Sequence, residues 1–277
     1  MKKVVIIGSN SFSGSSFTDY LLNKNYKVIG ISRSSESNFF FSRYSYNIKK
    51  KNFKFFKFNL NKDLSKIIEI IDKFKPEIII NFSAQSMVNE SWNKPLDWYE
   101  TNVIASISLF ENLMKKKYLK KFIQFSTPEV YGSTSTNIKE NNSFNPSTPY
   151  ALSRATSDAH INLINKEFGF PSIITRASNV YGEFQKLYRI VPLTIFKIIK
   201  KDKLYLHGGG MSKRSFIHIN DVNSALYQLI NKGKVGNTYH ISTHKKISIL
   251  ELVTLICKKM NYNLEDLIIK SEDRIGK

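Results

Sequence analysis

The N-terminal segment carries the feature that most restricts the fold: a strand, a tight turn, a helix and a second strand in quick succession. An apolar run over residues 3–8 ends in a turn of small residues. Phe17 and Leu21 then recur at helical spacing, and a second apolar run covers 27–31. Strands joined by a helical crossover run parallel, so this segment predicts a βαβ unit.

The same alternation continues well beyond this unit. The predicted strands cover 53–58, 77–82, 121–127 and 172–176, and the predicted helices cover 64–74, 96–114 and 149–168. Ile78, Ile79 and Ile80 show no polar alternation, which is typical of a strand covered on both faces. We therefore predict an α/β fold with a doubly wound parallel sheet of the Rossmann type.

The regular rhythm loosens after Gly182, which indicates two parts of unequal size. We assign 1–182 to a dinucleotide-binding domain, to which 212–238 returns. We assign 183–211 and 239–277 to a smaller C-terminal substrate-binding lobe. This lobe is expected to lie over the carboxyl ends of the strands, where open α/β sheets bind their ligands.

Composition narrows the partners of this 277-residue chain. The formal net charge of +20 could attract polyanions, but lysines are spread along the whole chain and no nucleic-acid-binding motif accompanies them. We therefore expect an anionic small-molecule substrate and no nucleic-acid partner. The five histidines are scattered along the sequence, so we also expect no metal site.

Membrane association and disulfide chemistry are not expected either. The apolar run after Lys2 and Lys3 ends at Gly8, too early for a signal peptide, and no later run reaches the about 20 apolar residues of a membrane span. The default location is the cytoplasm. The single cysteine, Cys257, lies in an apolar-periodic stretch, which predicts a buried thiol rather than a nucleophile.

The first turn is a candidate dinucleotide site. Its sequence runs from Gly8 to Gly14, with Ser11 in place of the middle glycine of the usual three and Phe12 after it. Backbone N–H groups at the start of the following helix can face a pyrophosphate at such a turn. A plain tight turn without a ligand is the alternative.

The residues after the second strand bear on which cofactor binds. An acidic residue there would bind the ribose 2′-hydroxyl and exclude a 2′-phosphate, but this sequence has Ser32 and Arg33. A guanidinium beside hydroxyls suits a phosphate, so the sequence favours NADP, with NAD as the alternative. Asn59, after the third strand, is placed to reach the adenine, and its neighbour Leu60 is included in the same site.

Two segments carry a family resemblance: 126–132, with the sequence STPEVYG, and 150–154, with the sequence YALSR. In this order and at this distance they resemble the extended short-chain dehydrogenase/reductase family of NAD-dependent epimerases and dehydratases. Within it they are most similar to the nucleotide-sugar 4,6-dehydratases, such as those acting on dTDP-glucose. Further segments in register extend the resemblance from Lys3 to Lys277. Chains of this family normally continue further, so this one is expected to lack the final helices.

The resemblance implies a role for each matching residue. The implied catalytic residues are Thr127, Glu129, Tyr150 and Arg154. The implied cofactor contacts beyond the first turn are Ser83, Asn102, Tyr150 and Arg154. The implied contacts to the substrate are Ser86, Asn179, Arg189, Arg214 and Arg274. The resemblance also implies a nucleoside diphosphate sugar as substrate, a role in polysaccharide biosynthesis, and a homodimer paired through helices over 96–116 and 149–168.

In the implied reaction, C4 of the hexose is oxidised by bound NAD(P), water is eliminated across C5 and C6, and the hydride returns to C6. Tyr150, as phenolate, takes the C4 hydroxyl proton while Thr127 hydrogen-bonds the same oxygen. The 4-ketone acidifies the C5 hydrogen, which Glu129 removes as general base. The chain would then be an NAD(P)-dependent hydro-lyase.

Two residues depart from the family pattern. Arg154 stands where the family has a lysine that lowers the tyrosine pKa and holds the nicotinamide ribose, and arginine keeps the charge but changes the geometry. Pro128 replaces an aspartic acid that protonates the leaving hydroxyl in enzymes acting on dTDP-glucose, although GDP-mannose enzymes manage without it. Pro128 leaves open an epimerase or oxidoreductase of the same family. Both departures leave open a catalytically silent dinucleotide-binding protein.

Overall fold

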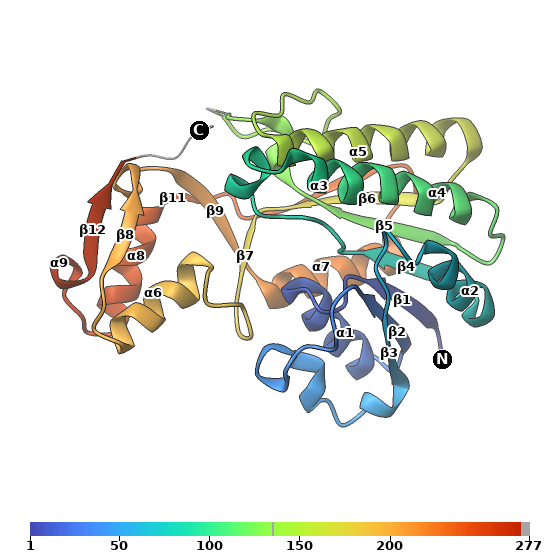
Figure 1. Ribbon diagram of the computed structural model, residues 1–277, viewed down its shortest axis with the longest axis horizontal. Helices are drawn as coiled ribbons and strands as arrows, with labels where there is room; N and C mark the ends of the chain where they lie inside the picture. Colours follow the sequence, from blue (N-terminus) through green and yellow to red (C-terminus); the bar gives the residue numbers. More distant parts are fainter. Residues whose placement is uncertain (135, 273–277) are drawn as a thin grey trace.

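The computed structural model describes residues 1–134 and 136–272, which form a large sheet between helices and a smaller lobe beside it (Figure 1). The strands of the seven-stranded sheet are β1 (Lys3–Ile7), β2 (Lys27–Ser32), β3 (Phe53–Lys57), β4 (Ile78–Asn81), β5 (Lys121–Ser126), β6 (Ser172–Ala177) and β10 (Thr238–Ile241). Their order is β10-β6-β5-β4-β1-β2-β3, and neighbours pair in parallel. The predicted doubly wound α/β fold is confirmed.

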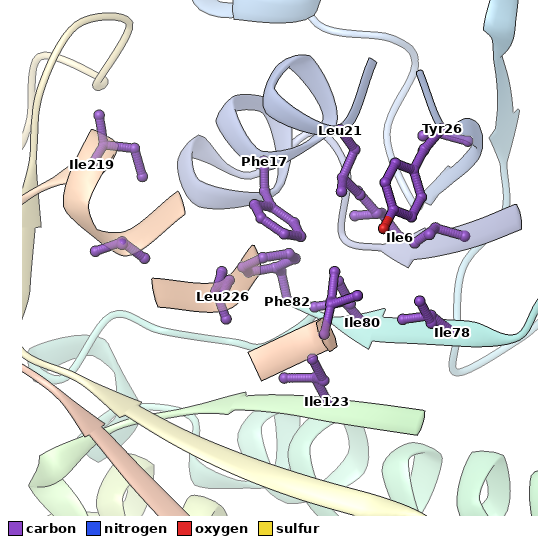
Figure 2. Close-up of a cluster of buried hydrophobic side chains, with 14 of the residues drawn as sticks. Ile6, Phe17, Leu21, Tyr26, Ile78, Ile80, Phe82, Ile123, Ile219 and Leu226 are labelled. Carbon is purple, nitrogen blue, oxygen red and sulfur yellow. The ribbon is translucent and has the colours of Figure 1, made fainter. Parts of the chain in front are cut away.

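Helices cover both faces of this sheet because successive side chains of a strand point to opposite sides. The covering helices are α1 (Phe12–Asn23), α2 (Leu64–Phe74), α4 (Ser106–Met114), α5 (Pro149–Phe168) and α7 (Ile219–Lys232). Val4 and Ile6 pack against α1 and α7, in the cluster that Figure 2 shows around Phe17. Val5 and Ile7 face the opposite way and pack with α2, α4 and α5.

The predicted helix over 96–114 forms, but its winding changes along its length. α3 (Pro95–Tyr99) is followed by a π-helical stretch, η5 (Glu100–Ala105), before α4 begins. Single π-helical turns occur frequently at functional sites. Asn102 lies in the middle of this stretch and is fully buried.

The lobe contains two small sheets and three helices. Its strands are β7 (Asn179–Tyr181), β8 (Leu204–His207), β9 (Lys213–His218), β11 (Lys246–Ser248) and β12 (Ile268–Ser271), and its helices are α6 (Ile190–Ile199), α8 (Ile249–Lys259) and α9 (Leu264–Leu267). β9 joins β7 to β11, and β12 pairs with β8. Cys257 lies in the core of this lobe with Leu204 and Val253, a buried thiol as predicted.

The boundary between the two parts differs from the expected one. Residues 239–241 were assigned to the lobe, but they belong to β10, which pairs with β6 at the edge of the large sheet. Residues 213–218 were assigned to the dinucleotide-binding domain, but they form β9 in a small separate sheet. Which sheet such a strand joins depends on pairing with segments far away in the sequence, and a local apolar pattern does not specify that partner.

Short helical turns occupy several connections. They are η1 (Phe39–Phe41), η2 (Arg43–Tyr46), η3 (Lys50–Asn52), η4 (Asn89–Trp92), η6 (Pro128–Tyr131) and η7 (Gly208–Gly210). Among the described residues, no helix combines the length and the apolar character needed to cross a bilayer.

Candidate active site

The turn between β1 and α1 is too crowded for side chains at its two glycines. Gly8 has φ +84°, and a Cβ there would lie 2.7 Å from the backbone nitrogen of Ser83. A Cβ on Gly14 would lie 2.3 Å from the carbonyl oxygen of Gly8. Ser11 caps α1, since its Oγ accepts a hydrogen bond of 3.0 Å from the Gly14 backbone nitrogen. The turn thus brings backbone against backbone at the start of a helix, the arrangement that suits a pyrophosphate.

A cleft of about 440 Å³ opens beside this turn, at the carboxyl ends of β1 to β4. We call it the smaller cleft. It is lined by the predicted cofactor residues Gly8, Ser11, Ser32, Arg33, Asn59, Leu60 and Ser83. Ser32 Oγ accepts a hydrogen bond of 2.9 Å from the Asn10 backbone nitrogen, which ties the end of β2 to the glycine turn. The Arg33 guanidinium is exposed at the cleft and lies 3.5 Å from Gln85 Oε1.

Asn102 lies behind the smaller cleft and lines neither cleft, unlike the position that the resemblance implies. Its amide nitrogen donates to Ser153 Oγ and to the Gln85 carbonyl, and its Oδ1 accepts from the Gln85 backbone nitrogen. The π-helical winding turns this side chain inward, where its polar atoms are already paired. Asn102 therefore holds the wall of the cleft through Gln85, which lines the cleft and which sequence reasoning missed.

A larger cleft of about 590 Å³ adjoins the smaller one and shares Asn10 and Ser11 with it. Its predicted residues are Phe12, Ser86, Thr127, Glu129, Tyr150, Arg154, Asn179, Arg189 and Arg214. They come from α1, the β4 and β5 ends, α5 and the lobe, and the fold brings them to one place. Pro128 lines the same cleft and is exposed. Arg274 lies outside the described residues.

Local structure explains how Thr127 and Tyr150 reach this cleft. Thr127 follows β5 directly and caps η6, its Oγ1 accepting a hydrogen bond of 3.3 Å from the Glu129 backbone nitrogen. Thr148 caps α5, its Oγ1 accepting from the Ala151 backbone nitrogen at 3.1 Å. Tyr150 therefore projects from the first turn of α5, and Glu129 from the turn after Thr127.

Burial raises the pKa of the Tyr150 hydroxyl, since an apolar surrounding disfavours the phenolate. The charge of Arg154 is the largest influence in the opposite direction, followed by a hydrogen bond with the Thr127 hydroxyl. Glu129 raises this pKa further, and Arg189 lowers it. The tyrosine thus lies within electrostatic reach of both the proposed base and the cation in its motif.

Arg154 is buried, and its Nη2 donates a hydrogen bond of 2.7 Å to the carbonyl oxygen of Phe125 in β5. Its Nε and Nη1 have no hydrogen-bond partner among the described residues. Buried donors of a charged group are costly to leave unpaired. Ribose hydroxyls of a dinucleotide would supply acceptors at this point of the cleft, so the residues present fit such a cofactor.

Comparison with known proteins finds matches among nucleotide-sugar 4,6-dehydratases. The family model described as GDP-mannose 4,6 dehydratase matches residues 5–275. A dTDP-D-glucose 4,6-dehydratase of Dictyostelium discoideum is 34% identical over 271 residues, which are 92% of this chain and 62% of that protein. The dTDP-glucose 4,6-dehydratase of Haemophilus influenzae is 31% identical over 235 residues, which are 77% of this chain and 70% of that protein. This chain thus spans about two thirds of the length of these relatives.

Solved structures agree with the sequence matches. The dTDP-glucose 4,6-dehydratase of Bacillus anthracis, in complex with NAD, has a TM-score of 0.87 and 27% identity, and the match covers 99% of this chain and 86% of that one. A UDP-glucose 4-epimerase of Thermotoga maritima has a TM-score of 0.86, which shows the shared fold. With its glycine turn, its Tyr150 motif and these matches, the chain belongs to the GDP-mannose 4,6 dehydratase family and hence to the extended short-chain dehydrogenases/reductases.

Proposed function

We propose that this protein is a nucleotide-sugar 4,6-dehydratase with a bound nicotinamide dinucleotide. The observation that supports it most strongly is the meeting of Tyr150, Thr127 and Glu129 in one cleft beside the glycine turn. A hydroxyl acid–base group, a hydrogen-bond partner and a carboxylate are the set that this elimination needs. The family matches support the same reaction class.

The cofactor, when bound, supplies the reversible oxidation at C4 that makes the C5 hydrogen acidic. Tyr150 Oη accepts the proton of the C4 hydroxyl, and Thr127 Oγ1 orients that hydroxyl. Arg154 keeps a positive charge beside the phenolate, which offsets the effect of burial. Glu129 accepts the C5 proton, and the C6 hydroxyl departs as water.

Pro128 favours the second candidate, an epimerase that stops after oxidation at C4. It lines the larger cleft, and its side chain has no proton to give to a leaving hydroxyl. A dehydratase must then protonate the C6 hydroxyl from water or another group. Glu129 favours the dehydratase, because an epimerase has no need for a base at C5.

We propose NADP as the preferred cofactor and NAD as the alternative. Arg33 follows β2 directly and lines the smaller cleft with Ser32 and Ser34, so a cation and two hydroxyls surround the place of a 2′-phosphate. Relatives of known structure were solved with NAD, which supports a nicotinamide dinucleotide but not the phosphorylated form in particular.

We propose that the substrate is recognised through a nucleoside diphosphate group, which stays attached to the sugar during the reaction. Arg189 and Arg214 line the larger cleft from the lobe. A guanidinium group can donate two parallel hydrogen bonds to the oxygens of one phosphate. Asn179 and Ser86 line the same cleft and add neutral polar groups. The catalytic residues lie on the sheet side, so the hexose would lie between the two groups.

We also propose a homodimer that forms through the layer of α3, α4 and α5. Leu96, Leu152 and Leu163 are large apolar residues that stay exposed on α3 and α5, and Ile104 is exposed on the stretch η5 between α3 and α4. Helices α3 and α4 pack beside α5, so the exposed residues share one layer. Ile104→Glu should give a monomer by light scattering, and a monomeric parent protein would contradict the proposal. A cytoplasmic location and a role in polysaccharide biosynthesis remain predictions.

The reaction is tested by incubating the protein with dTDP-, UDP-, GDP- and CDP-hexoses and measuring product mass. We expect a product lighter by one water from one of them. Glu129→Gln should abolish this loss and leave cofactor binding intact, whereas Glu265→Gln, on the exposed α9, should change neither. An unchanged mass with an altered C4 configuration would establish the epimerase instead.

A further inference from the structure

Beneath Tyr150 lies a cluster of three buried charged side chains that sequence reasoning did not single out as a group. Arg154 and Asp158 are one helical turn apart on α5, and Arg176 lies on β6. All three are at most 1% exposed. Arg176 Nε donates to Asp158 Oδ2 at 3.2 Å, a fully buried ion pair. Charges in such surroundings act over longer distances than at the surface.

Each member of the cluster is anchored to the sheet. Asp158 Oδ2 accepts a hydrogen bond of 2.9 Å from Ser126 Oγ, and Arg154 Nη2 donates to the carbonyl of Phe125. Phe125 and Ser126 are the last residues of β5, and Thr127 follows them. The same two contacts therefore hold the start of α5, which carries Tyr150, against the strand end that carries Thr127.

The cluster holds two guanidinium groups but one carboxylate. Burial raises the pKa of Asp158, while the charges of Arg154 and Arg176 favour its carboxylate. With Asp158 ionised, the cluster has one surplus positive charge while Tyr150 is protonated, and it becomes neutral when Tyr150 is a phenolate. Burying an unbalanced charge is costly, so the surplus favours the ionised tyrosine. Arg154 Nε, Arg154 Nη1 and Asp158 Oδ1 have no hydrogen-bond partner among the described residues, so the cluster's own hydrogen bonds do not fully neutralise its charges.

In the part of the chain that the structure describes, no other titratable group packed against the cluster adds a buried negative charge that would balance its surplus positive charge. Arg176 Nη1 donates to the Tyr131 hydroxyl, which also bonds His240 Nε2. Burial lowers the pKa of His240, which keeps it neutral at pH 7. Glu140 lies beyond His240 and is exposed, so water screens it.

Glu129 and Arg189 also face Tyr150 from the cleft side. They line the open cleft, where solvent and ligands reach them. Their influence on Tyr150 is therefore separate from that of the cluster beneath it.

We propose that Asp158 is a positioning residue that acts on Tyr150 through Arg154: its carboxylate offsets one of the two buried guanidinium groups and so sets the positive charge that the tyrosine faces. Asp158 touches neither substrate nor cofactor in this account. The hydrogen bond to Phe125 fixes the Arg154 guanidinium to β5, so Arg154 cannot move away from the tyrosine. Asp158 therefore sets how much positive charge Tyr150 experiences from Arg154, the residue that stands where the family has a lysine. The inference deepens the proposed function and depends on it only for its consequence in catalysis.

The test measures the ionisation of Tyr150 itself, without substrate. Protein labelled with ¹³C at tyrosine Cζ is titrated by NMR, and the Tyr150 signal is assigned as the one missing in Tyr150→Phe. In Asp158→Asn, which keeps size and polarity, we expect the pKa of Tyr150 to fall by about one unit, because a buried negative charge is removed. Asp202→Asn, an exposed aspartate paired with Lys197, should leave it unchanged.

A second pair of variants, made in an Arg176→Met background, guards against failure of Asp158→Asn to fold, because no Arg176 guanidinium is left there without its partner. Arg176→Met leaves Arg154 and Asp158, one cation and one carboxylate, and Arg176→Met with Asp158→Asn leaves Arg154 as one cation. The double variant should titrate at a lower pH than the single one. A Tyr150 pKa that stays within a few tenths, or rises, on Asp158→Asn in both backgrounds would overturn the inference. If the dehydratase activity itself were absent, this titration would still give its answer.

Discussion

The two clefts are built in different ways, although they adjoin each other. The smaller cleft is lined mostly by neutral groups that are tied to nearby backbone, as Ser32 is to Asn10. The larger cleft rests on buried charges held by contacts between distant elements, as Arg154 is held by β5. The first is shaped by its backbone before a ligand arrives. The larger cleft depends on a balance of buried charges, and this balance changes when Tyr150 loses its proton.

The largest expected effect is in the larger cleft. Tyr150→Phe removes the group that takes the C4 proton, so turnover should fall about a thousandfold. Dinucleotide binding, which rests mainly on the smaller cleft, should weaken by less than about tenfold, because only one hydroxyl is removed. Turnover assays and fluorescence titration measure the two properties. Tyr118→Phe is the matched control, because its hydroxyl bonds Asp72 on α2 at 2.7 Å, away from both clefts. An equal loss of turnover and of dinucleotide affinity would mean that the two clefts do not have separate roles in catalysis and cofactor binding.

The next effect is in the smaller cleft. Gly14→Ala forces a Cβ to within 2.3 Å of the Gly8 carbonyl oxygen, so the turn must shift. We expect dinucleotide affinity to weaken between about tenfold and a hundredfold, the cost of overpacking. Calorimetric binding measures it. Gly169→Ala, where nothing lies within 4 Å of the added Cβ, should lose some stability through its positive φ but keep affinity. Unchanged affinity in Gly14→Ala would show that the pyrophosphate does not bind at this turn.

Much of the smaller cleft could be predicted from the sequence, because its parts are local. Gly8, Ser11 and Ser32 lie at the ends of strands that apolar runs reveal, and parallel strands bring those ends to one edge. The helices over 64–74 and 149–168 matched the structure residue for residue. The lobe and the position of β10 could not be predicted so well, because edge pairing depends on contacts far apart in the sequence.

The larger cleft could be predicted only through its motif. The family resemblance implied the roles of Thr127, Glu129 and Tyr150, but nothing in the sequence showed that Asp158 and Arg176 form a buried ion pair close to Arg154. Asp158 is a polar residue on a helix, and such residues are usually solvated. Asn102 is buried within the π-helical stretch, and its burial could not be predicted from the sequence; its contact with the cofactor stays a prediction.

A moderate effect is expected from Arg154→Lys, which restores the residue of the family. The ammonium keeps the positive charge but cannot both reach Phe125 and present a planar fork, so the contact to β5 is lost. Turnover should fall about tenfold, the equivalent of one charge-assisted hydrogen bond. A rise in turnover would show that the arginine is a handicap rather than part of the charge balance.

The smallest effect is expected at the exposed Arg33. Arg33→Ser should weaken NADP binding about fivefold, in keeping with a solvent-exposed ionic contact, and change NAD binding little. Direct competition between the two cofactors measures the ratio. Lys57→Ser, at the end of β3, is the control for a simple change in net charge. Equal weakening of both cofactors would remove the basis for preferring NADP.

One isotope experiment tests most directly whether Tyr150 and Glu129 act on the same sugar. A nucleotide hexose with deuterium at C4 is converted in ordinary water, and the same unlabelled sugar is converted in D₂O. The account predicts a product lighter by one water, with the C4 deuterium at C6 in the first case and solvent deuterium at C5 in the second. A product of unchanged mass, with the C4 deuterium still at C4 and no exchange at C5, would contradict it.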